Sequence, residues 1–333
     1  MKKILIIFGG NSFEHEISCK SVNNILKNID KNKYNVDLVG INKKNSWFLI
    51  NNYSIIDEKW EKLEKIEIKN IIELLKKYDT VFPVMHGAYG EDGKIQSLFE
   101  LFNINYIGSS STSSKNAMDK YLTKLICEKN NIPQVPYFIL KKNEKIPKNI
   151  KYPLIVKPIN GGSSIGITIA HNKKELIKSI KYGLKFDQKV IVEKFIKCRE
   201  LECAIVENKN LIVSTVGEVK SCNEFYDFEA KYKKESEIII PTKLNKEIIR
   251  NIQKLAKKIF KVLDLKDFAR IDFLYDEINN VIYFNEVNTI PGFTDISMFP
   301  LLFKEQKLGF RKLISKIIEH WLYCNIQPHQ DNN

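Results

Sequence analysis

Residues 268–288 read FARIDFLYDEINNVIYFNEVN, and this stretch decides the fold that the sequence predicts. Apolar and aromatic residues dominate residues 268–275 and 281–287, which is typical of two strands. The polar residues 276–280 between them are few enough to form the turn of a hairpin. We therefore expect a pair of neighbouring antiparallel strands near the C-terminal end of the chain.

This hairpin would carry four polar side chains. Arg270 and Asp272 share one face of the first strand, and Glu286 and Asn288 share one face of the second, because side chains alternate along a strand. If the strands pair, the four groups converge, and two carboxylates and an amide oxygen, with phosphate oxygens, suit Mg²⁺. The alternative is an exposed polar strand face with a salt bridge. The apolar neighbours argue against it, since unpaired charge among them is costly without a ligand.

A glycine-rich segment, residues 161–166 (GGSSIG), lies between two expected strands and follows Lys157. Glycines let backbone N–H groups approach phosphates closely, and the two serine hydroxyls add donors. No G-K-[ST] follows, so the segment is not a Walker loop. Alone, it is as compatible with a plain turn as with a binding loop. With Lys157 before it and Glu193 and Lys194 on a later strand, it indicates a lid over a nucleotide.

Two further glycine motifs follow expected strands. Residues 86–93 (HGAYGEDG) lie between a buried strand and a helix. They form either a tight connection, in which Glu91 and Asp92 favour the helix N-terminus, or a functional loop. Gly9 and Gly10 end the first strand and resemble a dinucleotide-binding turn, but the G-x-G-x-x-G spacing is absent. The sequence therefore supports a dehydrogenase only weakly.

The N-terminal third is predicted to form an open, mostly parallel sheet with helices. A strand over residues 3–8 leads through a glycine turn into a helix over residues 14–29. Further strand and helix signals follow at residues 34–40, 66–77 and 80–85. The small polar tract 109–114 is expected to link this sheet to a helix over residues 115–129.

The rest of the chain is predicted to be richer in strands. Central strands are expected at residues 135–140, 154–157, 167–170 and 190–195. Asn172 and Glu175 predict the start of a helix between the last two. Next come strands at residues 201–206 and 211–219, a polar loop over 220–237, a helix over 245–263, the hairpin and two C-terminal helices. The tail from Gln327 is expected to be disordered.

Composition limits the class of protein. A chain of 333 residues that is 44% hydrophobic is expected to form two or three domains. It has no apolar run of roughly 18 residues, so no membrane span is expected. Its six cysteines show no CxxC pair and no histidine at metal spacing, which fits reduced thiols in a cytosol. The net charge of +13 raises the possibility of nucleic-acid binding, but the lysines occur in every segment, which is more typical of a solvated basic surface that favours anions.

Seven motifs occur in order along the chain: G-G-x-S-x-E, H-G-x-x-G-E-D-G, M-D-K, G-S-S-x-G, Y-D-x-E-A-K-Y, R-I-D and E-x-N-T-x-P-G. In this combination the sequence resembles the D-alanine–D-alanine ligases, from Gly9 to about Pro300. The resemblance implies an α/β, three-domain ATP-grasp fold. The expected parts are an N-terminal open parallel-sheet domain (1–115), a central domain with the glycine-serine lid (116–200), a C-terminal domain (201–325) and a tail (326–333).

The same resemblance implies an ATP site between the central and C-terminal domains. The residues implied for the phosphates are Lys120, Lys157 and Ser164. Those implied for adenine and ribose are Glu193, Lys194, Ile196 and Glu200. Two Mg²⁺ (or Mn²⁺) ions would be held by Asp272, Glu286 and Asn288.

The substrate residues are also implied by the resemblance. Glu14 would hold the ammonium group of the first D-alanine, and Ser163 with Tyr232 would complete a hydrogen-bonded link to a mobile loop. Lys231 and Ser297 would receive the carboxylate of the second D-alanine, and His86 belongs to the same substrate-binding set. Arg270 and the backbone N–H of Gly292 would form the oxyanion site. A loop over residues 224–237 would close and exclude water, which would protect an acyl phosphate.

The implied activity is the ATP-dependent joining of two D-alanines through an acyl phosphate, for peptidoglycan precursor synthesis. We expect a cytoplasmic homodimer that acts on D-alanine and ATP, without nucleic-acid or membrane partners. An ATP-grasp ligase with a different second substrate is the alternative: Tyr232 favours an amide over an ester product, but D-serine stays open. An inactive or nucleic-acid-binding relative would be expected to lack the metal set, which is complete. Cys198, where a glycine is common before Glu200, and Ile290 in the N-T-x-P-G turn are small departures; the first bears on the ribose contact.

Overall fold

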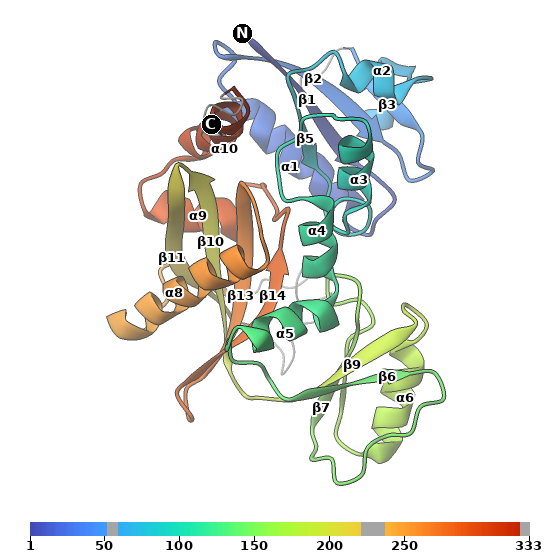
Figure 1. The fold of residues 1–333 in the computed structure, drawn as a ribbon, viewed down its shortest axis with the longest axis vertical. Coiled ribbons are helices and arrows are strands. Elements are labelled where there is room, and N and C mark those ends of the chain that lie inside the picture. The colour runs from blue at the N-terminus through green and yellow to red at the C-terminus, as the bar shows by residue number, and fades with distance from the viewer. Residues whose placement is uncertain (52–58, 221–236, 327–333) are drawn as a thin grey trace, which may run out of the picture.

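The computed structural model describes residues 1–51, 59–220 and 237–326, which are arranged around three sheets (Figure 1). The first sheet uses the N-terminal part of the chain, a four-stranded sheet follows in a lobe at the bottom of Figure 1, and a five-stranded sheet comes last. Three sheets agree with the predicted α/β organisation. The domain boundaries after residues 115 and 200 stay predictions.

The N-terminal sheet has the order β4-β3-β2-β1-β5. Its strands are β1 (Lys2–Gly9), β2 (Tyr34–Ile41), β3 (Trp47–Ile50), β4 (Lys65–Glu67) and β5 (Thr80–Val84). β1 pairs in parallel with β2 and β5, as predicted, whereas β3 and β4 pair antiparallel. The sheet is therefore mixed, because the short connection between β2 and β3 leaves no room for the crossover that a parallel pair needs.

Helix α1 (His15–Asn28) packs on this sheet through buried Val22, Ile25 and Leu26. The remaining helical segments here are η1 (Trp60–Lys62), α2 (Ile71–Leu75) and α3 (Lys94–Leu101). The predicted first strand and first helix are thus confirmed, with Glu14 at the N-cap position of α1.

Two helices connect the N-terminal sheet to the central lobe, where the sequence predicted a linker and one helix. They are α4 (Ser111–Met118) and α5 (Lys120–Lys129). The tract 109–114 is therefore not a plain linker, because the Ser110 side chain accepts the Ser113 N–H and caps α4. Asp119 is extended and breaks the predicted single helix; its carboxylate accepts the N–H groups of Tyr121 and Leu122, both at 2.9 Å.

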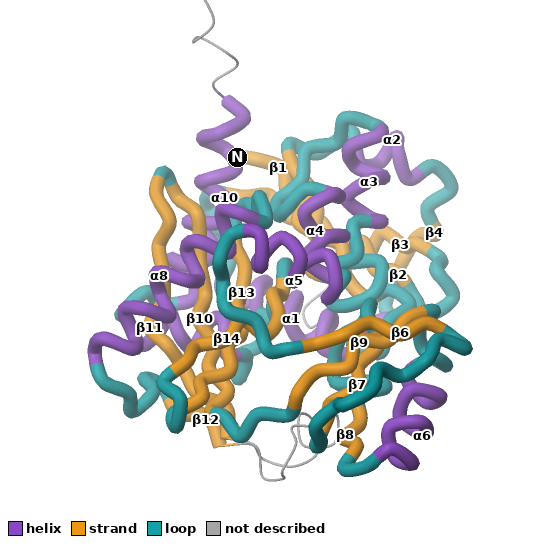
Figure 2. The backbone as a smooth tube through the Cα atoms, turned by 60° about the horizontal axis from the view of Figure 1, so that its bottom comes forward, coloured by secondary structure: helices purple, strands orange, loops and turns teal. Residues whose placement is uncertain are grey.

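The central sheet is antiparallel, with the order β6-β9-β7-β8. Its strands are β6 (Tyr137–Lys141), β7 (Leu154–Pro158), β8 (Thr168–Ala170) and β9 (Lys189–Lys194). Helix α6 (Lys173–Gly183) lies on the side of this sheet away from the C-terminal sheet (Figures 1 and 2). The predicted helix start is confirmed: Asn172 accepts the Glu175 N–H at 3.0 Å, and the Glu175 carboxylate accepts the His171 N–H at 2.7 Å.

The C-terminal sheet is antiparallel, with the order β12-β11-β10-β13-β14. Its strands are β10 (Arg199–Asn208), β11 (Asn210–Lys220), β12 (Glu237–Ile239), β13 (Phe268–Asp276) and β14 (Val281–Asn288). β13 and β14 form the predicted hairpin. Alternate residues of β10 pack toward α8 (Lys246–Val262) or toward α9 (Met298–Glu305) and α10 (Phe310–Ile326). Among the described helices, none has the length and apolar character that a membrane span requires.

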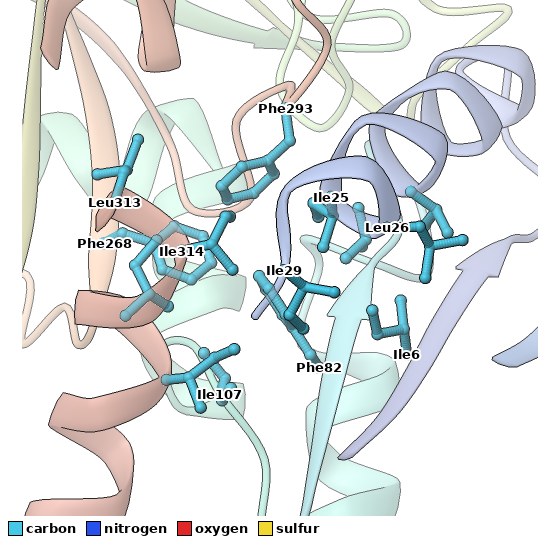
Figure 3. Packing of buried hydrophobic residues seen from close by; sticks show 14 of the residues in the cluster. Ile6, Ile25, Leu26, Ile29, Phe82, Ile107, Phe268, Phe293, Leu313 and Ile314 are labelled. Carbon is cyan, nitrogen blue, oxygen red and sulfur yellow. The ribbon is translucent and has the colours of Figure 1, made fainter. Parts of the chain in front are cut away.

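The N-terminal and C-terminal sheets share one hydrophobic core. Residues of β1, α1 and β5 belong to the same buried cluster as residues of β10, β13, α9 and α10. Figure 3 shows the part of the cluster formed by β1, α1, β5, β13 and α10. The Phe82 ring of β5 lies 6.1 Å from the Phe268 ring and 5.8 Å from the Phe293 ring, measured between centroids. The two ends of the chain are therefore packed as one body.

Replacing Phe82 by alanine tests this shared core. Phe82 is fully buried, so Phe82→Ala should lower the free energy of unfolding by about 3–5 kcal/mol through lost burial and the cavity left behind. Phe13, which is 77% exposed, provides the control: Phe13→Ala should change stability by about 0.5 kcal/mol or less. Urea unfolding followed by circular dichroism measures both, and equal effects would contradict the shared core.

Candidate active site

Two adjoining cavities lie between the sheets. The first, of about 550 Å³, is bounded by β7 and β9 of the central sheet and by β10, β13 and β14. The second, of about 810 Å³, is bounded by the start of α1, by residues 86–91 and by the turn after β14. Both cavities are lined by Lys120, Gly161, Gly162, Glu202 and Glu286. A molecule bound in one cavity would therefore meet a molecule bound in the other at this common wall.

The first cavity contains the residues predicted to bind a nucleotide: Lys120, Lys157, Ser164, Glu193, Lys194, Ile196 and Glu200. Apolar side chains that include Val135, Ile155, Phe195 and Leu274 line the same space. A largely apolar cavity with a few lysines suits a ligand that has a flat base and an anionic tail.

Glu193 lies in the wall of the first cavity, paired with two lysines. Its Oε1 is 2.9 Å from Lys124 Nζ, and its Oε2 is 2.7 Å from Lys157 Nζ. Burial alone would raise the pKa of the Glu193 carboxyl, but the two lysines outweigh it and hold the pKa at about 2. Glu193 is therefore a charged group that orients Lys157. Its second partner, Lys124, was not among the predicted site residues.

Three carboxylates form a row across the C-terminal sheet. In the β-ladders, Glu202 of β10 is the partner of Asp272 of β13, and Asp272 is the partner of Glu286 of β14. Directly opposed residues have Cβ atoms about 5 Å apart, so like charges repel unless cations lie between them. Arg270 supplies one cation, 2.8 Å from Glu202 and 2.7 Å from Asp272. Burial by itself would lower the pKa of Arg270, but these two carboxylates hold it well above its ordinary value.

An irregularity in the hairpin adds to this wall. The ladder shifts register after Asp272, which pairs with Glu286 while Phe273 pairs with Phe284. Asn285 is thus the extra residue of a bulge, and Asn285 and Glu286 both line the first cavity although neighbours in a regular strand point to opposite faces. Lys157 Nζ is 3.3 Å from Asn285 Oδ1. The bulge therefore brings a lysine-binding amide and a carboxylate to one place.

The predicted metal residues fit a hard cation. Asn288 Nδ2 is 3.1 Å from Asp272 Oδ2, so the amide lies beside the carboxylate row. Asp272 and Glu286 of the row supply carboxylate oxygens, which suit a hard cation. Within the described ranges, no group of three or more His, Cys, Asp or Glu side chains is arranged to hold a metal ion. The predicted set counts only two carboxylates, and its third ligand is an amide.

The glycine-serine segment separates the two cavities. Lys120 Nζ donates to the Gly161 carbonyl at 2.7 Å, which anchors the segment to the start of α5. Ser163 and Ser164 have φ values of 53° and 58°, in the left-handed region that non-glycine residues occupy rarely. Ser164 lines the first cavity and Ser163 lines the second. The unusual backbone therefore directs successive serines to opposite sides.

Glu14 approaches the second cavity beside two glycines. At Gly87, with φ of 71°, an added Cβ would lie 2.6 Å from Glu14 Oε2, so only glycine permits this approach. Ser12 Oγ accepts the Glu14 N–H at 3.2 Å and donates to the His86 carbonyl at 2.9 Å. The two N-terminal glycine motifs thus hold one carboxylate at the cavity wall.

The turn after β14 is held by hydrogen bonds from the N-terminal part. His86 Nδ1 lies 2.8 Å from the Ile290 carbonyl, and Glu91 Oε1 accepts the Ile290 N–H at 2.9 Å. Ser21 Oγ accepts the Phe293 N–H at 3.0 Å and lies 2.8 Å from His86 Nε2. The hydrogen bonds of all these groups can form together if His86 is neutral, with its proton on Nδ1. Burial lowers the pKa of His86, which favours this neutral form. We call this arrangement the turn clasp; Gly292 lies between the residues it holds.

Glu91 is a residue whose role sequence reasoning missed. Besides the Ile290 N–H, its carboxylate accepts the Gly87 N–H at 2.7 Å, so it does not favour the start of α3 as one interpretation held. That interpretation suits Asp92, which accepts the Lys94 N–H at 3.2 Å. Burial, with the nearby charge of Glu14, raises the pKa of Glu91 to about 8. Its position in a glycine-rich motif was the only sequence signal.

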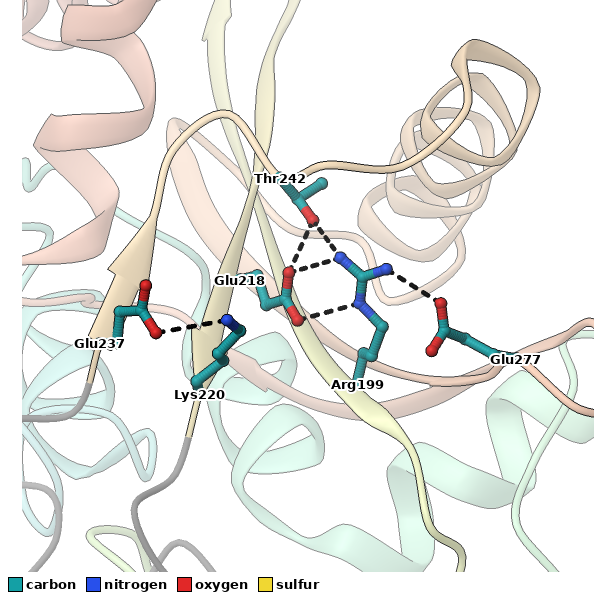
Figure 4. Close-up of polar contacts among 6 residues, drawn as sticks. All are labelled: Arg199, Glu218, Lys220, Glu237, Thr242 and Glu277. Atoms are coloured by element: carbon teal, nitrogen blue, oxygen red, sulfur yellow. Dashed lines mark hydrogen bonds and ion pairs between the residues drawn. The ribbon is translucent and has the colours of Figure 1, made fainter.

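A polar network holds the start of β10, next to Glu200. Arg199 pairs with Glu218 of β11 at 2.5 Å and with Glu277 of the β13–β14 turn at 3.0 Å, and Thr242 bonds to both Arg199 and Glu218 (Figure 4). Three segments of the C-terminal sheet are thereby tied together where the chain enters from the central lobe. The start of β10, which carries Glu200 into the first cavity, is fixed in place.

The two described residues that flank positions 221–236 also appear in Figure 4. Lys220 and Glu237 are neighbours in the β11–β12 ladder, and their side chains pair at 3.3 Å. Glu237 and Ile238 line the second cavity. Lys231 and Tyr232, and most of the predicted closing loop, lie outside the described residues, as does the tail from residue 327.

All predicted site residues in the described part line one of the two cavities. The second cavity contains Glu14, His86, Ser163, Arg270, Asn288, Gly292 and Ser297, and the first contains Asp272 and the nucleotide set. Residues from both ends of the sequence therefore meet, as the motifs suggested. Glu91, Lys124 and Glu202 complete the site but were not predicted.

Comparison with known proteins gives the family. One family model, described as D-ala D-ala ligase N-terminus, matches residues 3–109, and another, D-ala D-ala ligase C-terminus, matches residues 126–319. A D-alanine–D-alanine ligase of Acetivibrio thermocellus is 40% identical, over 99% of this chain and 97% of that protein.

Solved structures agree. The VanG D-Ala:D-Ser ligase from Enterococcus faecalis is 35% identical with a TM-score of 0.87, over 96% of this chain and 99% of that one. A D-alanine–D-alanine ligase from Bacillus anthracis complexed with ATP is 28% identical with a TM-score of 0.78, over 97% and 98% of the two chains. The fold is that of an ATP-grasp ligase. The chain belongs to the D-alanine–D-alanine ligase family, which confirms the resemblance seen in its motifs.

The pKa of Glu91 predicts a pH effect on stability. Because the folded protein holds this pKa at about 8, above the ordinary 4.5, it binds more protons than the unfolded chain between these values. The contribution of Glu91 to stability is thus present at low pH and is lost as the pH rises toward 8. Glu91→Gln should remove this pH-dependent contribution. As the pH rises from about 4.5 to about 8, the free energy of unfolding should therefore fall less steeply in the variant than in the wild type. Urea unfolding at several pH values measures it; parallel pH profiles would contradict it.

Proposed function

We propose that this protein joins two D-alanines to D-alanyl-D-alanine, converting ATP to ADP and phosphate, as a step in making peptidoglycan precursors. The observation that carries the proposal is the common wall of the two cavities, which contains Lys120, Glu202 and Glu286. A nucleotide in the first cavity and an amino acid in the second would meet there. Membership of the ligase family supports this chemistry.

In this proposal ATP occupies the first cavity. The base lies along Lys194 and Ile196, with the ribose near Glu200, and the phosphates lie toward Lys120, Lys157 and the Ser164 segment. Buried lysines offset phosphate charge more strongly than exposed ones, because the surrounding dielectric is lower. Asp272, Glu286 and Asn288 would hold two Mg²⁺ (or Mn²⁺) ions, which when bound neutralise charge on the transferring phosphoryl group.

The first step makes a carboxyl group reactive. A carboxylate is a poor electrophile, so the carboxylate oxygen of the first D-alanine attacks the γ-phosphorus, the bond to the β-phosphate oxygen breaks, and ADP leaves. The product is an acyl phosphate. Glu14 would hold the ammonium group of this D-alanine, which directs its carboxylate toward the common wall.

The second step forms the amide. The uncharged amine of the second D-alanine attacks the acyl carbon and gives a tetrahedral oxyanion. As this intermediate collapses, the bond between the acyl carbon and the phosphate oxygen breaks, and the nitrogen gives up one proton, which leaves with the phosphate. Arg270 and the Gly292 N–H would stabilise the oxyanion, and loss of one such donor typically costs about 3 kcal/mol of barrier. The turn clasp holds Ile290 and Phe293, so the Gly292 N–H is oriented before charge develops.

Ser297, Lys231 and Tyr232 are proposed to act on the second substrate and on closure. Ser297 lies beside Gly292, since a Cβ added at Gly292 would be 2.6 Å from Ser297 Oγ. Glu237 and Ile238, which follow residues 221–236 in the chain, line the second cavity, where Lys231 would act on a carboxylate and Tyr232 on Ser163. We also propose that the reaction takes place in the cytoplasm and that the enzyme is a homodimer.

A D-serine-accepting ligase is the second candidate. It is favoured by the structural similarity to a D-Ala:D-Ser ligase, whereas the relative with 40% identity is named a D-alanine–D-alanine ligase. Mass spectrometry of products from equal amounts of D-alanine, D-serine and D-lactate separates the candidates. We expect D-alanyl-D-alanine to dominate and the ester to be absent. A dominant D-alanyl-D-serine peak would transfer the proposal to the second candidate.

Phosphate release tests the reaction directly. With Mg²⁺ and ATP present, the purified protein should release phosphate when D-alanine is added, because only the acyl-phosphate route consumes the γ-phosphoryl group. L-alanine should give little release, since its side chain and ammonium group exchange places. Equal phosphate release with D-alanine and L-alanine would contradict the proposal that D-alanine is the substrate.

Glu286→Gln tests the common wall. Glu286 lies on both cavities, and losing its charge should lower kcat by about a hundredfold or more, since transition-state charge would be less well stabilised. The fold should be retained, because glutamine has nearly the same shape. Glu305→Gln, at an exposed position of α9, is the matched control and should keep full activity. Undiminished kcat in Glu286→Gln would refute the metal assignment.

A further inference from the structure

Lys124 is a buried lysine that does not reach either cavity. It lies on α5, its relative exposure is 2%, and it is absent from the lining of both cavities. Its Nζ lies 2.9 Å from Glu193 Oε1, 3.3 Å from Gln134 Oε1 and 5.2 Å from the centroid of the Tyr137 ring. Burying an ammonium group is costly, and these three contacts offset part of the cost. Their presence indicates that the positive charge of Lys124 has a role in the structure.

The partner of Lys124 is also the partner of Lys157. The two oxygens of the Glu193 carboxylate have different partners: Oε1 contacts Lys124 and Oε2 contacts Lys157. Lys157 Nζ further contacts Asn285 Oδ1 and lies in the lining of the first cavity. Glu193 is therefore the contact that links Lys124 to Lys157.

Lys124, Glu193 and Lys157 form a triad, and its net charge determines how strongly the site around Lys157 attracts an anionic ligand. Two ammonium groups and one carboxylate leave the triad with one net positive charge. Without Lys124, the Glu193–Lys157 pair would be neutral, and both carboxylate oxygens would be available to a single lysine. A neutral pair attracts a polyphosphate less than a net cation does, most of all at a buried site where charge is weakly screened.

We propose that Lys124 is a positioning residue for nucleotide binding: by occupying one oxygen of Glu193, it keeps Lys157 available to the phosphates of ATP. The inference rests on the proposed function for the identity of the nucleotide. It assigns a role to α5, the helix that connects the N-terminal sheet to the central lobe. Lys124 touches neither the nucleotide nor the reacting atoms.

The test is a double-mutant cycle on Lys124 and Glu193. Lys124→Met should raise the KM for ATP about tenfold, with the KM for D-alanine changed by about twofold or less. In a Glu193→Gln background, Lys124→Met should change the KM for ATP by about twofold or less, because the carboxylate through which Lys124 acts is gone. Lys129→Met, at an exposed position of the same helix, is the matched control and should leave the KM for ATP unchanged.

Other results would overturn the inference. A Lys124→Met variant with lower thermal stability but an unchanged KM for ATP would make Lys124 purely structural. An equal rise of KM in both backgrounds would mean that Lys124 does not act through Glu193. If Lys124→Met does not fold, Lys124→Leu, which likewise has neither the charge nor a donor for Glu193, enters the same cycle with the same criteria. Calorimetric titration of each variant with Mg-ADP keeps the test independent of turnover, so a wild-type protein that makes no dipeptide would disprove the proposed function and not this inference.

Discussion

The antiparallel pairing of β10, β13 and β14 is the constraint on which the site depends. It places Glu202, Asp272 and Glu286 side by side, where their charges would repel one another without cations. Arg270 offsets part of that repulsion, and Glu202 and Glu286 line both cavities. The lysines of the central lobe lie across the first cavity, so anionic and cationic surfaces face each other over the space where a nucleotide and its metal ions would fit.

The N-terminal part is as necessary to this arrangement as the sheet itself. A shared core fixes β5 and α1 against β13 and α10, and the turn clasp then holds the backbone at Ile290 and Phe293 from both sides. The Glu14 carboxylate, proposed to bind the first substrate, and the Gly292 N–H, the proposed oxyanion donor, are thereby held in one cavity. Packing supplies the rigid contact, and hydrogen bonds supply the orientation, since packing alone does not direct an N–H group.

Much of the fold followed from local patterns. The first strand, the hairpin, the helix start at Asn172 and the C-terminal helices were predictable because hydrophobic period and caps act over a few residues. The tract 109–114 was misjudged because serines suit both a linker and an N-cap, and only neighbouring backbone geometry distinguishes them. Strand β3 and the antiparallel pairing of β3 and β4 were not predicted, since a short strand does not reveal the direction of its partner.

The residue types of the site and their motifs can be recognised in the sequence alone, because glycines, lysines and carboxylates at set spacings reflect local chemical requirements. Tertiary structure alone decided which of them share a wall, where the hairpin bulges at Asn285, and that Glu91 and Lys124 belong to the site. These depend on contacts between segments as far apart as residues 91 and 290. The energy of such contacts depends on how deeply the two groups are buried and how close they lie in space, and a local pattern of residues determines neither.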